Sequence, residues 1–420
     1  MTSHKLIALW AVLMLSILEV SAQIIKGSIR DESNQEILPF ATINFVGTSI
    51  GTISNENGDF ELQVPEGFED KQIEVSYMGY YSKKLAVDQI QGIIIIELKP
   101  STLTLAELVI RPLSPQDYIK RVVKNMDKVL SQKAVQSQSY YREKFMENGQ
   151  YLAFSEGIWK AFHQSYNDTT KNQYQLMLYE TAENPAELQF MKTRRDKKNE
   201  KKRAKAEKKG EDFEPSEGLI NATFGGPDEI LEMDMNNELD EFLDSTYFKK
   251  FRYEFGTPMA FRDRELLVIN FESKGKVDHI RSKGKIYIDT RTDAIASLDF
   301  DAEAVIPIAI EPILFAFGIS LDNPIVKKQM RYQLIDGSWY PEYFYINVNM
   351  KIKKRNLFSA NETSNFFIEQ LFKINSLNAE DPVEINSEYR YNKDKDPSEQ
   401  VFNTENLKWE DFSRLTDANQ

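Results

Sequence analysis

The sequence predicts a mainly β protein, in which a small N-terminal β-sandwich precedes a larger curved antiparallel sheet with a few packed helices. Three observations lead to this fold class. Apolar and polar residues alternate in short runs along most of the 420 residues. Aromatic residues make up 12% of the chain and mix with β-branched residues, as is typical of strands. Gly and Asn turns separate the runs at short intervals.

The first 22 residues have the features of a secretory signal peptide. His4 and Lys5 precede an apolar run over residues 6–18, and a small-x-small cleavage site ends at Ala22. The apolar run is too short to span a bilayer, and no later run of about 20 apolar residues follows, so we expect no transmembrane helix. The chain contains no cysteine, so we expect neither a lipoprotein anchor nor a disulfide framework.

Residues 23–99 are predicted to form the sandwich, because six or seven short strands with glycine turns occur within them. The stretch SNENGDFEL, residues 54–62, has some character of a calcium loop. With Gly58 at the sixth loop position, however, the first and last ligand positions fall on Ile53 and Val64, which cannot bind a cation. We therefore predict a hairpin turn here.

The segments GSIRD, PFATINFVGTSIGTISNENGDFEL and IEVSYMGY, in this order, make residues 23–99 resemble the carboxypeptidase regulatory-like domain. This immunoglobulin-like sandwich occurs at the front of many envelope proteins of Gram-negative bacteria. The resemblance therefore implies an exported protein of the periplasm or the outer-membrane periphery. It also implies a structural or docking module, because the domain carries no zinc ligands or catalytic residues. The matched positions are Gly27, Asp31, Pro39, Gly47, Thr48, Gly51, Thr52, Gly58, Phe60, Ser76, Gly79 and Tyr80.

Residues 100–136 are predicted to contain a connector and one amphipathic helix. Ser114 can cap this helix, and Pro115 suits its first position. Apolar residues at a spacing of three to four follow from Ile119 to Leu130 and form one face. We expect this face to pack against the sheet that follows.

Residues 137–378 are predicted to form the large sheet, with a strong hairpin signal at Asn148-Gly149. The segments GKIYIDTRTDAIASLDFDAE and QMRYQLIDGSWYPEYFYINVNM are similar to the half-barrel of periplasmic lipoprotein-carrier and sensor proteins. Together with YYREKF and FSEGIW, they also resemble an uncharacterised family of envelope proteins. The resemblance implies a curved antiparallel sheet that wraps a helix and leaves an apolar cavity.

The apolar segment 304–321 is the candidate lining of that cavity. Its prolines, Pro307 and Pro312, and Glu311 argue against a membrane-spanning helix. We expect it to plug or line the sheet and to bind an apolar or amphipathic ligand. The candidate ligand-contacting residues are Ile308, Ile310, Ile313, Phe315 and Phe317.

A basic insertion, residues 192–215, interrupts the predicted sheet and holds eleven Lys or Arg between Lys192 and Lys209. Such a run is typical of a solvated insertion, but it can also contact an anionic membrane surface. The candidate contact residues are Arg194, Arg195, Lys197, Lys198, Lys201, Lys202 and Arg203.

Two further segments are predicted in the C-terminal half. Residues 225–251 are expected to form a helix capped near Asp228. Residues 379–420 are acidic and are expected to form a solvated tail, in which Trp409 and Phe412 could dock on one edge of the sheet.

The sequence provides no catalytic motif, so we expect no enzyme, no metal and no cofactor. The net charge of −13 argues against a nucleic-acid partner. His163 and His279 are expected to be ordinary surface or strand residues. Glu143 and Glu156, on neighbouring predicted strands, are the one carboxylate pair that we name for hydrolysis, but ion pairs with Arg142 or Lys144 are the favoured explanation of both.

Three functions stay open at this point. The first is a non-enzymatic envelope protein that binds an apolar ligand or an outer-membrane partner. The second is a scaffold of an outer-membrane transport or secretion complex, with the basic insertion and the acidic tail as contact points. The third is a carboxylate-based hydrolase or glycan-binding accessory that uses exposed Trp159 or Trp339.

Overall fold

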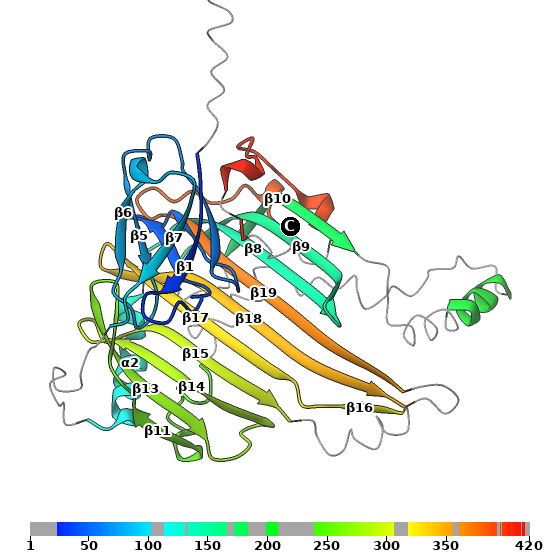
Figure 1. Cartoon of the computed structure of the whole chain (residues 1–420). Helices are drawn as coiled ribbons and strands as arrows, with labels where there is room; N and C mark the ends of the chain where they lie inside the picture. Colours follow the sequence, from blue (N-terminus) through cyan, green and yellow to red (C-terminus); the bar gives the residue numbers. More distant parts are fainter. Residues whose placement is uncertain are drawn as a thin grey trace, which may run out of the picture.

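The computed structural model confirms the mainly β fold, with a small N-terminal sheet domain and a large curved antiparallel sheet (Figure 1). The predicted signal peptide lies outside the described residues. The described residues are 23–101, 113–130, 133–165, 172–183, 199–208, 239–305, 318–355, 361–392, 395, 397–412 and 414–415.

Two small sheets form the N-terminal sandwich. In the first sheet, β1 (Ile24–Asp31) lies between antiparallel β4 (Asp59–Gln63) and parallel β7 (Ile93–Leu98). The second sheet has the order β3 (Gly51–Ile53), β2 (Thr42–Phe45), β5 (Gln72–Ser76) and β6 (Lys83–Ala86), followed by the short helix η1 (Val87–Gln89). Alternate residues of both sheets point inward and form the core, including Ile29, Ile43, Phe60, Leu62, Ile73 and Val75.

The prediction of a hairpin at residues 54–62 is wrong, although the turn itself is present. The strands on its two sides belong to different sheets, because β3 pairs with β2 and β4 pairs with β1. The Oδ1 atom of Asn55 accepts hydrogen bonds of 2.9 Å from the backbone N–H groups of Asn57 and Asp59. Gly58 has φ of 75°, a conformation that favours glycine. The stretch is therefore a crossing between the two sheets of the sandwich.

The large sheet contains twelve strands, and all of its strand pairs are antiparallel. Its main path is β10-β9-β8-β19-β18-β17-β15-β14-β13-β11, with β12 beside β13 and β16 beside β18. The bounds are β8 (Val135–Glu147), β9 (Gln150–His163), β10 (Gln173–Glu183), β11 (Phe251–Phe255), β12 (Met259–Phe261), β13 (Arg264–Ser273), β14 (Ile280–Asp289), β15 (Ala294–Ala304), β16 (Ile319–Leu321), β17 (Ile325–Ile335), β18 (Ser338–Lys354) and β19 (Glu362–Asn378).

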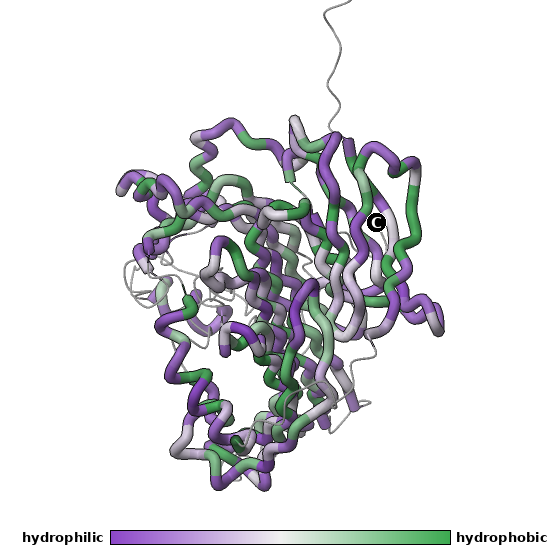
Figure 2. Tube along the Cα trace, turned by 90° about the vertical axis from the view of Figure 1, so that its left-hand side faces the viewer, coloured by the Kyte–Doolittle hydropathy of each residue, from purple (hydrophilic) through white to green (hydrophobic). Residues whose placement is uncertain are grey.

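The hairpin between β8 and β9 is confirmed, and Asn148 and Gly149 both adopt positive φ in its turn. Successive strand residues point to opposite faces of the sheet. Helix α2 packs on one face and the sandwich packs on the other. Hydrophobic and hydrophilic residues alternate along its strands accordingly (Figure 2). Tyr141 belongs to the core on the side of the helix, whereas Tyr140 belongs to the cluster on the side of the sandwich.

The predicted amphipathic helix is confirmed as α2 (Pro115–Val129), with the Oγ atom of Ser114 accepting from the N–H of Asp117. Its buried face is Tyr118, Ile119, Val122 and Met126, which pack on the large sheet. An ion pair of 2.6 Å between Arg121 and Asp293 fixes the helix to the turn before β15.

Two predictions about the C-terminal half need correction. Residues 239–250 form turns and the short helix η4 (Phe248–Lys250) rather than the end of an α-helix, while residues 225–238 lie outside the described part. In these turns Phe242 is buried in the core, where its ring stacks on Phe271 of the large sheet at a centroid distance of 3.9 Å.

The acidic end is not a solvated tail in its described residues. It covers the edge strand β10: the N–H groups of Tyr391 and Phe402 donate to the carbonyls of Tyr174 and Leu176. An edge strand offers unpaired backbone groups, and here the tail pairs with those of Tyr174 and Leu176. The docking of Phe412 is confirmed, since Phe412 is buried, as are Ile385 and Leu415. The segment contains the short helices η5 (Ser387–Tyr389), η6 (Pro397–Gln400) and η7 (Trp409–Asp411).

Within the described ranges, none of the helices combines the length and the apolar character needed to cross a membrane.

Candidate binding cleft

A cleft of about 860 Å³ opens between the sandwich and the face of the large sheet that lies opposite α2. The sandwich provides its roof through Pro39, Phe40, Glu56 and Tyr77. The floor comes from the middle strands of the large sheet. Clefts of this size between two structural units are typical ligand sites.

The outer row of the floor is a cross-strand ladder of alternating charge. Lys283 on β14 is opposite Asp301 on β15, and Asp301 is opposite Lys327 on β17. Glu272 and Asn347 continue the row on the outer strands. Residues in register point to the same face, so all five side chains face the cleft.

The inner row of the floor is closer to the sandwich. It contains Lys285, Asp299, Gln329 and Tyr345, again in cross-strand register. Burial raises the pKa of Asp299, although the nearby Arg331 guanidinium opposes this shift. The Oε1 atom of Gln329 is buried and accepts no hydrogen bond within the described part of the chain.

The crossing at residues 54–58 forms one wall of the cleft. It holds Glu56 over β18, where the hydroxyl of Tyr345 is 3.2 Å from Glu56 Oε1 and 3.4 Å from Glu369 Oε2. Desolvation raises the pKa of Glu56, and the Glu369 carboxylate raises it further. Phe40 packs on the ring of Tyr345 at a centroid distance of 4.4 Å. The stretch with some character of a calcium loop therefore shapes one wall of the cleft.

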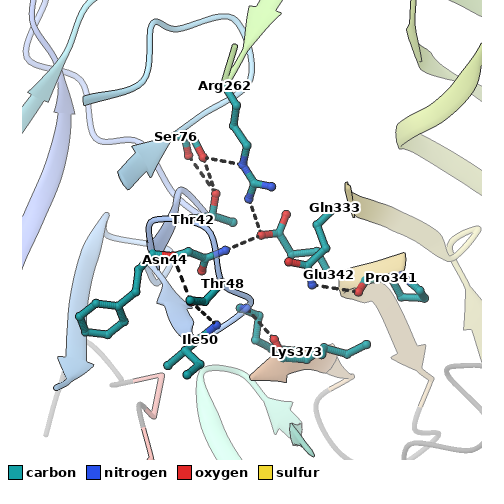
Figure 3. Close-up of polar contacts among 12 residues, drawn as sticks. Thr42, Asn44, Thr48, Ile50, Ser76, Arg262, Gln333, Pro341, Glu342 and Lys373 are labelled. Carbon is teal, nitrogen blue, oxygen red and sulfur yellow. Dashed lines mark hydrogen bonds and ion pairs between the residues drawn. The ribbon is translucent and has the colours of Figure 1, made fainter. Parts of the chain in front are cut away.

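A buried polar network joins the sandwich to the large sheet (Figure 3). Glu342 of β18 is completely buried, and its Oε1 atom accepts from Asn44 Nδ2 at 3.0 Å and from Arg262 Nη2 at 2.6 Å. Arg262 Nε also donates to the hydroxyl of Ser76 at 3.4 Å. We call Asn44, Ser76, Arg262 and Glu342 the clamp, because they tie both sandwich and sheet to one carboxylate.

The charges around Glu342 favour the ionised form of its carboxyl group. Burial alone would raise the pKa of Glu342, but the positive charges of Arg262, Lys373 and Arg331 hold this pKa below its usual value. Lys373 is also buried, and burial lowers its pKa to about 8. Breaking a buried ion pair by removing one partner is costly, because the remaining charge is left buried without a counter-charge.

Two further contacts hold the sandwich in place. The N–H of Gly79 donates one backbone hydrogen bond to the carbonyl of Ala260 at 3.1 Å, and Ser49 Oγ accepts from the N–H of Leu377 at 2.9 Å. Phe40 and Ile53 of the sandwich also share an apolar cluster with residues of the sheet and of the tail, namely Tyr140, Ile158, Met177, Tyr343, Tyr345, Leu371, Phe412 and Leu415. The sandwich is therefore packed on the sheet as a fixed part of the molecule.

The residues predicted to line an apolar cavity fall outside the described part of the chain. This applies to Ile308, Ile310, Ile313, Phe315 and Phe317. The described cleft differs from the expected cavity in two ways: it lies on the opposite side of the sheet from α2, and its floor is charged.

The predicted anionic-surface residues are only partly described. Arg194, Arg195, Lys197 and Lys198 lie outside the described residues. Lys201, Lys202 and Arg203 belong to a helical segment at 199–208, and their side chains are exposed.

The prediction that Glu143 and Glu156 form a hydrolytic pair is wrong. Glu143 is opposite Ser155 and Glu156 is opposite Arg142 in the β8–β9 register, so the two carboxylates point to opposite faces of the sheet. Glu143 accepts from Tyr141 and Ser155 at 2.9 Å each, whereas Glu156 accepts from Tyr140 at 2.6 Å and pairs with Arg414. They cannot flank one bond.

The predicted ion pairs of Arg142 and Lys144, and the predicted exposure of Trp159 and Trp339, also differ from what the structure shows. Arg142 pairs with Glu369 at 2.7 Å, and Lys144 approaches the same carboxylate at 3.5 Å. Trp159 and Trp339 are buried, so neither offers a ring to a glycan. Trp339 Nε1 instead donates to Thr292.

Sequence reasoning missed the cleft itself. The alternating basic residues of Arg281–Ser282–Lys283–Gly284–Lys285 indicate one charged strand face, but only the docking of the sandwich shows that this face is part of a cleft. A search of the described residues finds no cluster of His, Asp and Glu that could hold a metal ion.

Comparison with known proteins identifies the N-terminal part. Residues 25–110 match the family model of the CarboxypepD_reg-like domain, which confirms the resemblance noted in the sequence. No curated protein matches the chain. A similar solved structure is a DUF1329 family protein from Desulfovibrio piger ATCC 29098, at 11% identity over 65% of this chain and 96% of that chain. Its TM-score of 0.23 does not establish a shared fold. The chain thus joins a CarboxypepD_reg-like domain to a large antiparallel sheet, and no enzyme family is indicated.

Proposed function

We propose that this chain is an exported, non-catalytic protein of the bacterial envelope that binds a ligand in the cleft beneath its CarboxypepD_reg-like domain. The observation that carries the proposal is the cleft of about 860 Å³, because both the sandwich and the sheet contribute to it. Export is supported by the signal-peptide features of residues 1–22.

The clamp supports a binding role for the sandwich. A domain held by a buried carboxylate, by the hydrogen bonds of Gly79 and Ser49 and by a shared apolar cluster keeps one position relative to the sheet. The cleft is therefore preorganised, which reduces the entropy lost when a ligand binds. An outer-membrane or other envelope protein could dock on the same fixed domain.

The composition of the cleft suits binding better than nucleophilic catalysis. Its described lining consists of Lys, Asp, Glu, Asn, Gln and aromatic side chains with Pro39 and Gly284, and it includes no Ser, Thr or His. Nucleophilic catalysis in proteins usually pairs a hydroxyl or thiol with a positioned base.

Native mass spectrometry tests the cleft directly. The mature protein, purified from an envelope fraction, should carry a discrete added mass. Asp301→Trp places an indole on the cleft floor and should remove this mass. Glu303→Trp is the matched control, because Glu303 lies on the same face of β15 but does not line the cleft. An added mass that survives Asp301→Trp would contradict the proposal.

A ligand of apolar character is the prediction from segment 304–321. Aromatic rings pack in the described core on the side of α2, for example Phe242, which stacks on Phe271 and contacts Phe300 edge to face. A fluorescent fatty-acyl probe separates the two sites. Uptake that persists in Asp301→Trp would locate the apolar ligand outside the cleft.

A second candidate function is contact with an anionic membrane surface through the basic insertion. The exposure of Lys201, Lys202 and Arg203 on one short helical segment favours it. Each Lys or Arg near an anionic surface contributes about 1 kcal/mol. Replacing all three with Gln should weaken binding to phosphatidylglycerol vesicles by roughly a hundredfold. The triple variant Lys120→Gln, Lys124→Gln, Lys128→Gln on α2 provides the charge-matched control.

A further inference from the structure

Three exposed lysines in the cleft have no ion-pair partner among the described residues. Lys283, Lys285 and Lys327 project from β14 and β17 into the cleft, and no ion pair within the described ranges includes any of them. Most other charged groups around the cleft are engaged: Glu56 accepts from Tyr345, and Lys328 pairs with Asp240 at 3.8 Å. The three ammonium groups are therefore available to a ligand.

The acidic and amide groups between these lysines limit what the ligand can be. Asp301 stands between Lys283 and Lys327 in register, and Asp299 stands beside Lys285. A continuous polyanion would place negative groups against these carboxylates. A ligand with spaced negative groups and hydroxyls between them would instead donate to Asp301 and contact the lysines on either side.

The spacing supports a saccharide. Lys283 and Lys327 are separated by two strand spacings, which is about 10 Å and comparable to the length of a disaccharide unit. Asn347 and Gln329 add amide groups on the same floor, and the Oε1 atom of Gln329 has no described donor. On the roof, Pro39 and the half-buried ring of Tyr77 offer apolar surface to the C–H groups of a sugar.

From this geometry we propose that the cleft binds an acidic saccharide, a hydroxyl-rich ligand with carboxylate or phosphate groups, and that Lys283, Lys285 and Lys327 contact the acidic groups. The inference rests on the proposed binding function of the cleft and names its ligand class. Charge-assisted hydrogen bonds from lysine give such a site its affinity and make it sensitive to salt.

Isothermal titration calorimetry of the full exported protein tests the ligand class. Trigalacturonate provides carboxylates, and glucose 1,6-bisphosphate provides phosphates. At least one should bind, and the triple variant Lys283→Gln, Lys285→Gln, Lys327→Gln should weaken it by about tenfold or more. The triple variant of Lys120, Lys124 and Lys128 on α2 loses the same charge and should bind as the unaltered protein does.

The comparison ligands decide between the alternatives. Maltotriose, a neutral sugar, should bind much more weakly; equal binding would overturn the role of charge. Tighter binding of hexaglutamate would overturn the saccharide in favour of an acidic peptide, and equal binding of inorganic phosphate would reduce the site to an anion site. If neither acidic sugar binds, while Asp301→Trp still removes a native added mass, the ligand class is wrong and the cleft function stands. If Asp301→Trp leaves that mass in place, the cleft function itself fails.

Discussion

Asn44 of the sandwich donates a hydrogen bond of 3.0 Å to Glu342 of the large sheet, across a sequence separation of 298 residues. Glu342 is completely buried, so this bond and the Arg262 ion pair replace the hydration of its Oε1 atom. One carboxylate of the sheet thus contributes to the position of the sandwich, together with the hydrogen bonds of Gly79 and Ser49 and the shared apolar cluster.

The clamp is expected to contribute strongly to stability. Glu342→Ala leaves Arg262 and Lys373 without their buried counter-charge and should lower the free energy of unfolding by about 3–5 kcal/mol. Asn44→Ala should cost about 1–2 kcal/mol. A double-mutant cycle in urea should give a coupling energy of about 1 kcal/mol or more between the two sites. Additive effects would show that Asn44 and Glu342 act independently; Glu272→Ala on the exposed floor is the control.

The crossing at residues 54–58 should be more sensitive to a methyl group than an open turn. At Gly58, with φ of 75°, an added Cβ would lie 2.8 Å from the carbonyl oxygen of Ile29. At Gly67, with φ of 82°, an added Cβ would meet nothing within 4 Å. Gly67→Ala should therefore cost about 1 kcal/mol, from backbone strain alone, and Gly58→Ala roughly 2 kcal/mol or more. Equal losses of melting temperature would contradict this.

His163 should make the protein sensitive to acid. It is 2% exposed, and burial lowers its pKa to about 4 from the usual 6.5. Between these values the unfolded chain binds the proton and the folded chain does not, so this contribution to stability is lost as pH falls from 6.5 to 4. The loss is about 3 kcal/mol. His163→Gln should reduce the difference between unfolding free energies at pH 6.5 and pH 4, and exposed His279→Gln controls for loss of an imidazole.

The C-terminal segment should behave as part of the core. Phe412→Ala removes a buried ring from the cluster that contains Phe40 and Tyr345, and it should cost about 3 kcal/mol. Val383, in the same segment, is 61% exposed, so Val383→Ala should change stability by less than about 0.5 kcal/mol. Similar unfolding midpoints for the two variants would mean that Phe412 is not held in the cluster in solution.

Local chemistry made several elements predictable from the sequence. The cap at Ser114 and the Asn148-Gly149 turn depend on neighbouring residues, and both occur as expected. The crossing at Gly58 could not be separated from a hairpin, because the same turn residues serve both. The cleft could not be predicted either, since Glu56 and Lys283 line one cleft only after the sandwich docks on the sheet. Residues 379–420 were predicted to be solvated because many of them are acidic. That composition reflects the exposed side chains and does not reveal the apolar residues between them that pack on the sheet.

The pairing of β8 with β19 has a consequence for the order of folding. These strands begin and end the large sheet in sequence, yet they are adjacent at its middle, as in the pair Arg142 and Leu371. A chain made or exported from its N-terminus can form β8-β9 and β13-β14 as hairpins early. It cannot join the two halves of the sheet until residues 362–378 have arrived. Until that moment the halves expose the edges of β8 and β18, so we expect the nascent protein to depend on chaperones until residues 362–378 are free to pair.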